Sequence, residues 1–370
     1  MTKTFKHHML KEIFEQPAAV LETIKAGTST EGTFYQQSWK NAGFERLHRI
    51  VIAASGTSRH AGIAGEFMIE SLTGIPVDVD YASEFQFSPV TVSPDVLTVV
   101  ITQSGETADT LAALRKAKGL GSKVVTISNV ADSSMMKEAD FRIHTKAGPE
   151  LAVPSTKTFT GQLTALILFA LFLAEKRPKA DQKTLKGLRE ELASLPRKIQ
   201  KVLELEAQCE ILARRFAQCT DFIFAAKGIH RAAALDGALK LKEVSYLHAE
   251  AFPSGEILHG PLATIDEDMA VIVIATVDVA DAESQARYEK TISNLKELKG
   301  RSGRVVALAV EGDKRVPKIV DDVIFVPAAP DLLLPILEIV PLQLFAYHLA
   351  VLLGRNVDNP RSLAKAVVTD

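Results

Sequence analysis

Two stretches of the chain follow the same plan, and this repetition constrains the fold more than any other feature. Residues 49–54 are apolar after Arg49 and run into Ser55-Gly56-Thr57-Ser58. Residues 221–226 are apolar after Asp221 and run into Lys227-Gly228-Ile229-His230. A helical segment rich in small residues follows each turn. Apolar strands separated by helical segments are typical of parallel sheets covered on both faces. The sequence therefore predicts an α/β protein with two doubly wound parallel-sheet domains in tandem, produced by internal duplication.

Each predicted sheet takes further strands from the strand-like runs that follow. These are residues 76–81, 97–102 and 123–128 in the first half, and residues 269–275, 304–310 and 322–327 in the second. The polar segment 176–182 contains a proline and predicts a linker. We therefore expect one domain at residues 1–180, with a helical entry segment, and a second at residues 181–370, ending in a C-terminal tail.

Composition narrows the classes of function. The formal net charge of the 370 residues is −2, with acids and bases interspersed, so no basic face for nucleic acid or an anionic membrane is expected. Cys209 and Cys219 form neither a disulfide framework nor a CxxC metal site. The longest apolar run, residues 163–174, is shorter than the roughly 20 residues that span a bilayer and predicts a buried helix. The N-terminus lacks the apolar core of a secretion signal, so a cytoplasmic, metal-free protein is expected.

Two loops rich in small hydroxyl residues follow predicted strands and indicate anion binding. The first is residues 55–58, and the second, residues 102–107, reads Thr-Gln-Ser-Gly-Glu-Thr and precedes a helix. Glycine lets backbone N–H groups approach an anion, hydroxyls donate further hydrogen bonds, and a helix N-terminus favours negative charge. The alternative is that Ser and Thr only cap the two helices. Neither loop has the spacing of a dinucleotide or nucleoside-triphosphate motif, so no such cofactor is expected.

A third loop, residues 148–158, contains Val153 and Ser155 and precedes the predicted buried helix. It is expected either to close over the same ligand or to cap that helix. The candidate ligands of a phosphate in the first two loops are Ser55, Gly56, Thr57, Ser58, Thr102, Gln103, Ser104 and Thr107.

Charged groups in the second half indicate proton transfer. If residues 236–243 are helical, Asp236, Lys240 and Glu243 lie at i, i+4 and i+7 on one face. His259 follows at the end of a loop closed by glycine and proline. A carboxylate, an amine and an imidazole can open a sugar ring and move a carbon-bound proton. The alternative is a surface helix with an Asp–Lys pair and an unrelated histidine.

These motifs, taken in order, resemble the sugar isomerase (SIS) domain family. The likeness is strongest to the isomerase domain of the glucosamine-6-phosphate synthases and covers almost the whole chain. It rests on residues 11–17, 55–58, 103–107 and 155–157 in the first half, and on residues 238–243, 248–251, 259–261 and 357–365 in the second.

The resemblance implies a role for each matching residue. The hydroxyl-rich loops would hold a sugar 6-phosphate, and Lys365 would form a Schiff base with the C2 carbonyl of a ketose. Glu243 would move a proton between C1 and C2, with Lys240 and Asp236 around it. His259 would assist ring opening from the neighbouring subunit, which implies a homodimer.

Two departures from the family pattern are visible. The synthases begin with a glutaminase domain, whereas this sequence starts at the isomerase domain, so hydrolysis of glutamine by that route is not expected. Ser55 stands where the synthases usually have cysteine, a conservative change for phosphate binding.

The expected activity is interconversion of glucosamine 6-phosphate with fructose 6-phosphate plus ammonia, with deamination as the net direction. The first alternative is synthesis of glucosamine 6-phosphate from free ammonia or from ammonia supplied by a separate glutaminase. The second, of another class, is a non-catalytic regulator that senses a sugar phosphate. Binding alone needs none of Glu243, His259 and Lys365, so these residues favour an enzyme.

Overall fold

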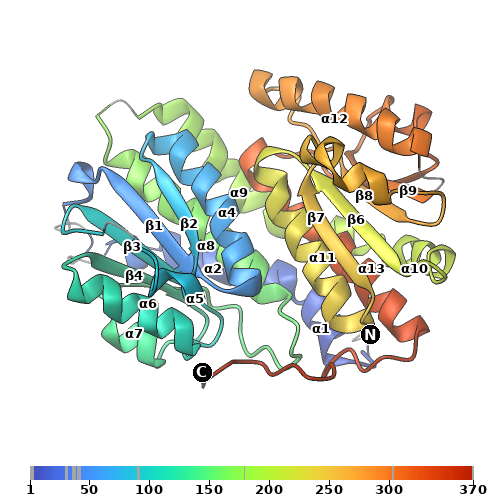
Figure 1. Cartoon of the computed structure of the whole chain (residues 1–370). Helices are drawn as coiled ribbons and strands as arrows, with labels where there is room; N and C mark the ends of the chain where they lie inside the picture. Colours follow the sequence, from blue (N-terminus) through green and yellow to red (C-terminus); the bar gives the residue numbers. More distant parts are fainter. Residues whose placement is uncertain are drawn as a thin grey trace. The chain divides into compact units, whose positions relative to one another are not determined.

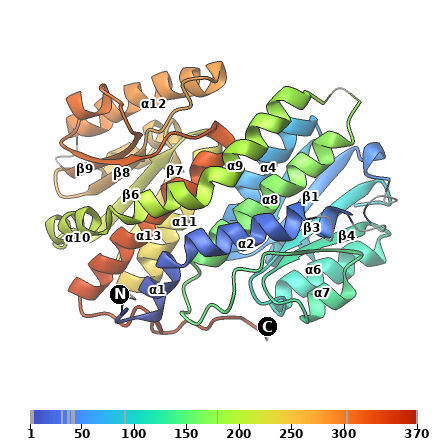
Figure 2. The same ribbon diagram turned by 180° about the vertical axis from the view of Figure 1, so that it is seen from behind.

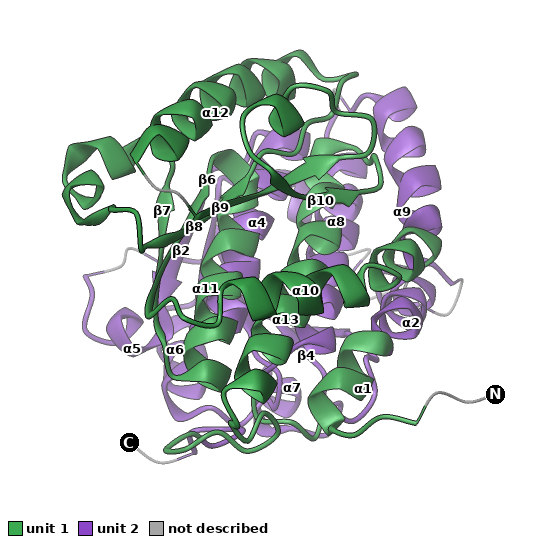
Figure 3. Ribbon diagram, turned by 90° about the vertical axis from the view of Figure 1, so that its right-hand side faces the viewer, with its two compact units in different colours: residues 1–14, 151–154, 197–363 green, residues 15–150, 155–196, 364–370 purple. Residues whose placement is uncertain are grey.

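The computed structural model describes residues 4–29, 32–35, 39, 43–89, 92–178, 180–301 and 304–368, and the chain divides into two compact units (Figure 3). Unit 1 comprises residues 1–14, 151–154 and 197–363, and unit 2 comprises residues 15–150, 155–196 and 364–370. Each unit therefore takes segments from both halves of the sequence. The predicted boundary between residues 180 and 181 stays a prediction. Residues 1–3 and 369–370, at the ends of the predicted domains, lie outside the described residues.

Unit 2 is built on a parallel sheet. Its strands are β1 (Arg49–Ala54), β2 (Val77–Tyr81), β3 (Val96–Ile101), β4 (Lys123–Ser128) and β5 (Phe141–His144). In the described part of the chain they form one five-stranded sheet in the order β2-β1-β3-β4-β5, and every neighbouring pair is parallel (Figure 1). All residues of β3 are buried, as expected for a central strand that is covered on both faces.

Helices cover both faces of this sheet (Figures 1 and 2). On one face lie α2 (Gln16–Thr28), α4 (Gly56–Thr73) and α8 (Lys157–Glu175), and on the other lie α5 (Ala82–Phe85), α6 (Ala108–Gly119) and α7 (Ser134–Glu138). Successive side chains of β1 point to opposite faces of the sheet, so the strand packs against both helix layers. Ile52 faces α4 at Gly62, whereas Val51 packs in a cluster with Leu114 of α6. Short 3₁₀ helices, η1 (Thr33–Tyr35) and η2 (Phe44–Arg46), precede β1.

Unit 1 repeats this plan. Its strands are β6 (Asp221–Ala226), β7 (His248–Pro253), β8 (Ala270–Ile274), β9 (Arg304–Val310) and β10 (Asp322–Val326), in the parallel order β10-β9-β8-β6-β7. One face carries α1 (His8–Phe14), α10 (Glu206–Arg215), α11 (Arg231–Ser245) and α13 (Leu334–Leu352), and the other carries α12 (Ala282–Arg301) (Figure 1). The helix α9 (Gln182–Leu203) begins in unit 2 and ends in unit 1, with the division after Pro196. The 3₁₀ helices of unit 1 are η3 (Gly228–His230), η4 (Glu256–His259), η5 (Pro261–Thr264), η6 (Val316–Lys318) and η7 (Asp331–Leu333).

The two sheets share one topology, which confirms the predicted fold class. With β6 to β10 taken as counterparts of β1 to β5, both sheets have the strand order 2-1-3-4-5 of a doubly wound fold. Each predicted strand is present within one or two residues of its predicted ends. The sequence analysis does not predict β5 and β7, which lie at sheet edges. The motif at residues 248–251 lies in β7.

The predicted buried helix at residues 163–174 is present but longer than the apolar run. It belongs to α8, which is buried from Lys157 to Ala174. By length and composition alone, α8 and the segment 331–352 could each cross a membrane, yet 94% and 89% of their apolar windows are buried within the protein. Both segments serve as core helices of the units that contain them.

Candidate active site

The sheet of unit 2 brings the two hydroxyl-rich loops together at its topological switch point. Strands β1 and β3 are neighbours, and Ala54 pairs with Ile101 at their carboxyl ends. β1 leads into α4 on one face, whereas β3 leads into α6 on the other (Figure 1). The loops of residues 55–58 and 102–107 therefore start side by side, where ligands of doubly wound sheets bind.

The first loop opens α4, and its N-cap serine does not cap the helix. Ser55 occupies the N-cap position, but its side chain makes no capping hydrogen bond. Gly56 has a left-handed φ of 52°, and Gln162 of α8 donates a hydrogen bond of 2.9 Å to the Ser58 hydroxyl. The first N–H groups of a helix have no partner within the helix. The loop thus offers N–H groups and hydroxyls to an anion, which favours binding over simple capping.

The second loop is folded by its own side chains. Thr102 Oγ1 accepts a hydrogen bond of 3.1 Å from the Gly105 N–H, and Ser104 Oγ accepts one of 3.2 Å from the Glu106 N–H. Gly105 has a φ of 72°. Thr107 is the N-cap of α6, and its side chain makes no capping hydrogen bond either. Both loops therefore end at a helix N-terminus whose dipole favours a phosphate.

The C-terminal tail brings Lys365 to this end of unit 2. The Ala108 N–H, in the first turn of α6, donates a hydrogen bond of 3.0 Å to the Val367 carbonyl. Lys365 lies two residues earlier, and its Nζ is 2.5 Å from Glu150 Oε2. Unit 2 therefore combines the predicted phosphate loops with the predicted Schiff-base lysine.

Glu150 is a residue of this site that the sequence analysis does not predict. Its side chain is fully buried in front of α8, where Oε1 accepts hydrogen bonds from the N–H groups of Thr156 (2.9 Å) and Thr158 (3.1 Å). Oε2 accepts from the hydroxyls of Ser155 (3.1 Å) and Thr158 (2.8 Å). Burial favours a neutral carboxyl, but the Lys365 ammonium and these hydrogen bonds outweigh it and hold the pKa of Glu150 below its usual value.

In unit 1, the predicted proton-transfer residues lie on α11 as expected for a helix. Asp236 and Lys240 are buried, and the Lys240 ammonium forms an ion pair with the Glu243 carboxylate. Glu243 is one-fifth exposed and lines a cavity of about 510 Å³. The other lining residues are Leu239, Lys242, Tyr246, Leu247, His248, Arg361, Ser362 and Leu363.

The start of the tail forms part of this cavity in unit 1. The Arg361 N–H donates a hydrogen bond of 2.8 Å to the Tyr246 hydroxyl, and the Arg361 guanidinium lies 4.4 Å from the centre of the Tyr246 ring. Tyr246 itself ends α11 with a left-handed φ of 66°, a conformation that is uncommon for aromatic residues. Strained backbone of this kind is concentrated at functional sites.

Two further predicted residues also belong to unit 1. His259 ends η4 with an exposed side chain, next to Gly260 with a φ of 143°. The Val153 N–H donates a hydrogen bond of 2.8 Å to the Asp358 carbonyl, while Ser155 belongs to unit 2. The predicted set therefore divides into phosphate loops with Lys365 in unit 2, and Asp236, Lys240, Glu243, His259 and Val153 in unit 1.

Unit 1 has a counterpart of the first phosphate loop, but its own side chains fill it. Residues 227–230 follow β6, and Gly228 repeats the left-handed backbone with a φ of 59°. His230 Nδ1 lies 2.6 Å from Glu338 Oε1, and its Nε2 lies 3.4 Å from Asp331 Oδ1. Burial favours the neutral imidazole, but these carboxylates outweigh it and raise the pKa of His230 to about 9. Carboxylates here disfavour a second phosphate site.

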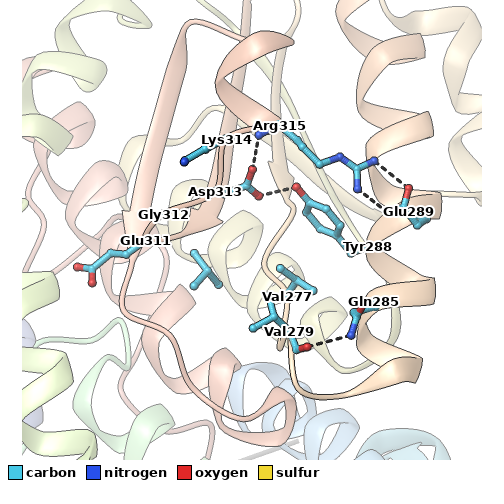
Figure 4. A pocket seen from close by; sticks show the side chains of 11 residues that line it. Val277, Val279, Gln285, Tyr288, Glu289, Glu311, Gly312, Asp313, Lys314 and Arg315 are labelled. Atoms are coloured by element: carbon cyan, nitrogen blue, oxygen red, sulfur yellow. Dashed lines mark hydrogen bonds and ion pairs between the residues drawn. The ribbon is translucent and has the colours of Figure 1, made fainter.

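A second cavity of unit 1, of about 440 Å³, lies between α12 and the loops after β8 and β9 (Figure 4). Several of its polar groups pair with one another. The Tyr288 hydroxyl donates to Asp313, and Arg315 forms an ion pair with Glu289 (Figure 4). None of the predicted site residues lines this cavity.

Comparison with known proteins decides the family. The sequence profile of the SIS domain matches residues 44–172 and 215–353, one segment for each sheet. The chain belongs to the SIS domain family. Glutamine–fructose-6-phosphate aminotransferase (isomerizing) from Chlorobaculum tepidum is 44% identical to this SIS chain over 369 residues, which are 99% of the chain and 59% of that protein. The chain thus spans less than two thirds of the length of the curated relatives that it matches.

Solved structures of SIS proteins have the same fold. The C-terminal domain of glucosamine-fructose-6-phosphate aminotransferase from Francisella tularensis has a TM-score of 0.89 and 38% identity, and the match covers 96% of this chain and 98% of that chain. Glucosamine-6-phosphate deaminase from Thermotoga maritima has a TM-score of 0.71 and 21% identity, with 97% and 99% covered. The predicted membership of the SIS family is therefore confirmed, and the deaminase adds a likeness of fold alone.

Proposed function

We propose that this SIS chain interconverts glucosamine 6-phosphate with fructose 6-phosphate plus ammonia. The observation that carries the proposal is the grouping, in unit 2, of two hydroxyl-rich helix N-termini with the Lys365 amine. The loops suit a phosphate monoester, and a primary amine beside them suits the carbonyl of an open-chain sugar. The aminotransferases from Chlorobaculum tepidum and Francisella tularensis, 44% and 38% identical to this chain, are named for the same class of substrate and support the proposal.

Each candidate residue has a role in this proposal. The loops bind the 6-phosphate through Ser55, Gly56, Thr57, Ser58, Thr102, Gln103, Ser104 and Thr107, with Val153 and Ser155 beside the bound sugar. Lys365 condenses with the C2 carbonyl. Glu243 moves the proton between C1 and C2, and its ion pair with Lys240, next to the buried Asp236, fixes its position. His259 assists ring opening in the site of a second subunit, which its exposed side chain permits.

The proposal covers both directions of the reaction. Deamination releases ammonia and fructose 6-phosphate, and synthesis consumes them. The names of the relatives at 38–44% identity favour synthesis, in which ammonia is free or comes from a separate glutaminase. The ratio of the two rates at matched substrate concentrations decides between them.

Turnover of fructose 6-phosphate with ammonium tests the proposed roles of Lys365 and Glu243. We expect Lys365→Ala and Glu243→Gln to lower kcat by roughly 1,000-fold or more, because one removes the nucleophile and the other the proton acceptor. Matched controls are Lys186→Ala and Glu190→Gln, which remove an exposed pair on α9 and should keep wild-type turnover. Full activity of either site variant would contradict the mechanism.

The same assay separates the enzyme from a sugar-phosphate sensor. A sensor would be stabilised thermally by fructose 6-phosphate and would turn over none of the hexose or hexosamine phosphates. Turnover that depends on Lys365 excludes the sensor.

A further inference from the structure

One carboxylate in unit 2 is aimed at the Lys365 amine by a set of hydrogen bonds. The Glu150 side chain has no exposed surface, whereas Lys365 keeps 24% of its own. The two carboxylate oxygens of Glu150 accept hydrogen bonds from different groups. Oε1 accepts from the backbone at the start of α8, and Oε2 accepts from two hydroxyls and from the Lys365 ammonium.

We propose that Glu150 is the counter-ion and positioning residue of Lys365, which holds the amine at the site and balances the positive charge on its nitrogen during Schiff-base formation. This inference rests on the function proposed above. Glu150 does not touch the reacting carbon in this account and acts only through Lys365.

The charge on the Lys365 nitrogen is the same before and after the condensation. Summed over all steps, the ammonium group (R–NH₃⁺) and the C2 ketone give an iminium (R–NH⁺=C2) and one water molecule. The nitrogen attacks C2 only after it has given up one proton, and the C2 oxygen receives that proton before it leaves as water. The Nζ–C2 bond forms, the C2–O bond breaks, and the oxygen leaves with two of the ammonium protons. One positive charge is present on each side of the equation, so a fixed carboxylate beside Nζ neutralises both states.

Glu150 is built to stay ionised through this step. The N-terminus of α8 and four hydrogen bonds favour the charged carboxylate, and its pKa lies below the usual value for glutamate despite complete burial. A carboxylate held in this way is a poor proton acceptor. It therefore acts as a fixed negative charge, while the proton transfers are left to other groups.

The geometry also explains how an extended tail can present a precise amine. The tail backbone is fixed two residues after Lys365, where the Val367 carbonyl accepts a hydrogen bond from the Ala108 N–H. The Lys365 side chain is fixed by its ion pair with Glu150. A comparable pair in the same unit, Lys157 with Glu15, joins two helical segments, and its carboxylate is 36% exposed. Glu150 differs from Glu15 because a preorganised, buried carboxylate loses little freedom when it binds its lysine.

The Glu150→Gln variant tests this inference. The amide oxygen can still accept from the Thr156 and Thr158 N–H groups, so the loop keeps its fold while the charge is lost. We expect kcat with fructose 6-phosphate and ammonium to fall by about 100-fold, the usual cost of removing one group that stabilises charge at a reacting centre. KM for fructose 6-phosphate should stay within about threefold of wild type, because the phosphate loops are unchanged.

A second readout follows the Schiff base directly. Borohydride reduction in the presence of fructose 6-phosphate should attach the sugar to Lys365, and mass spectrometry of the intact protein gives the yield. We expect a much lower yield for Glu150→Gln than for wild type. Glu150→Asp keeps the charge one methylene away and should recover part of both kcat and yield. If the glutamine variant does not fold, the aspartate variant takes its place, with intermediate losses expected.

The controls separate failure of this inference from failure of the proposed function. Glu138→Gln removes a carboxylate from the exposed Arg115 pair in the same unit and should match wild type. Full turnover by Lys365→Ala would overturn the function itself. If Lys365→Ala is inactive but Glu150→Gln keeps wild-type kcat and yield, the counter-ion role is wrong. The counter-ion role would also be wrong if Glu150→Gln raised only KM and gave the wild-type yield of reduced Schiff base at saturating fructose 6-phosphate. That pattern would indicate a defect in the loop rather than at Lys365.

Discussion

Single glycines set the shape of the candidate phosphate loops. Gly105 has a φ of 72°, and a methyl group on its Cα would come 2.3 Å from Ser133 Cβ. Gly56 has a φ of 52° at the start of α4. Such conformations turn successive N–H groups toward one side and make anion-binding concavities. The loops therefore depend on backbone geometry as much as on hydroxyl side chains.

We expect Gly105→Ala to damage both folding and binding. The left-handed backbone and the clash with Ser133 should together lower the free energy of unfolding by about 2 kcal/mol or more. The displaced loop should also raise the Kd for fructose 6-phosphate. Thermal unfolding with and without this ligand measures both effects.

Gly119→Ala is the matched control. Gly119 lies in α6, and no atom is within 4 Å of an added Cβ. Alanine should be neutral or stabilise the helix by up to about 1 kcal/mol. Equal effects of the two substitutions would refute the structural account of the second loop.

The candidate site could be predicted residue by residue only where a motif marks it. The hydroxyl-rich loops and the acids and lysine of α11 have recognisable spacings, and the structure has them at helix N-termini and on one helix. Glu150 has no such spacing, because its partner Lys365 lies 215 residues away. The available signal is weak: an acid followed at short range by Ser155, Thr156 and Thr158, the residues that open α8.

At the scale of elements, a buried charged cluster joins four elements of unit 1. His230 of η3 contacts Glu338 of α13 and Asp331 of η7, and Arg287 of α12 pairs with Asp331. The Thr276 hydroxyl donates to Glu338 as well. Each charge has a partner of opposite sign, and the ion pairs of His230 contribute to stability only while its imidazole is protonated.

This cluster predicts a loss of stability in alkaline solution. The pKa of His230 is raised from 6.5 to about 9 in the folded chain. Its contribution is therefore fully present below pH 6.5 and is lost as the pH rises through about 9. Over that window the free energy of unfolding should fall by up to about 1.4 kcal/mol per pH unit. Urea unfolding at a series of pH values measures the slope.

The double variant His230→Gln/Glu338→Gln is the control for this slope. Two amides can hydrogen-bond to each other without a titrating group, so the alkaline loss should be smaller than in wild type. An identical pH dependence in the two proteins would assign the loss to other groups.

The elements themselves were predictable where burial is continuous. β1, β3, β8 and β9 are long apolar runs because both faces are covered. The edge strands β5 (Phe-Arg-Ile-His) and β7 (His-Ala-Glu-Ala-Phe-Pro) mix polar and apolar residues, since part of each strand is exposed. These segments become strands because they pair with a neighbouring strand, and no local sequence pattern reveals that pairing.

At the scale of the whole molecule, the proposed chemistry draws on residues of both units and of two subunits. In the proposed mechanism, the residues assigned to phosphate binding and Schiff-base formation belong to unit 2, and Glu243, assigned to proton transfer, belongs to unit 1. We propose that His259 acts in the site of a partner subunit. A two-fold homodimer then contains two equivalent shared sites.

Mixing of two inactive variants tests the shared site. His259→Ala and Lys365→Ala homodimers each lack one group in every site. After random subunit exchange, half of the dimers are mixed and one of their two sites is intact, so about a quarter of wild-type activity should return. Absence of recovery, with exchange confirmed by native mass spectrometry, would place His259 in the site of its own subunit or outside any site.

The central claim is the reaction at C2 of an amino-sugar phosphate, and one assay tests it most directly. Purified chain is incubated with glucosamine 6-phosphate while ammonia and fructose 6-phosphate are measured in the same sample. We predict equal amounts of the two products, with their release abolished in Lys365→Ala. Release of neither product by a folded protein that binds fructose 6-phosphate would contradict the claim.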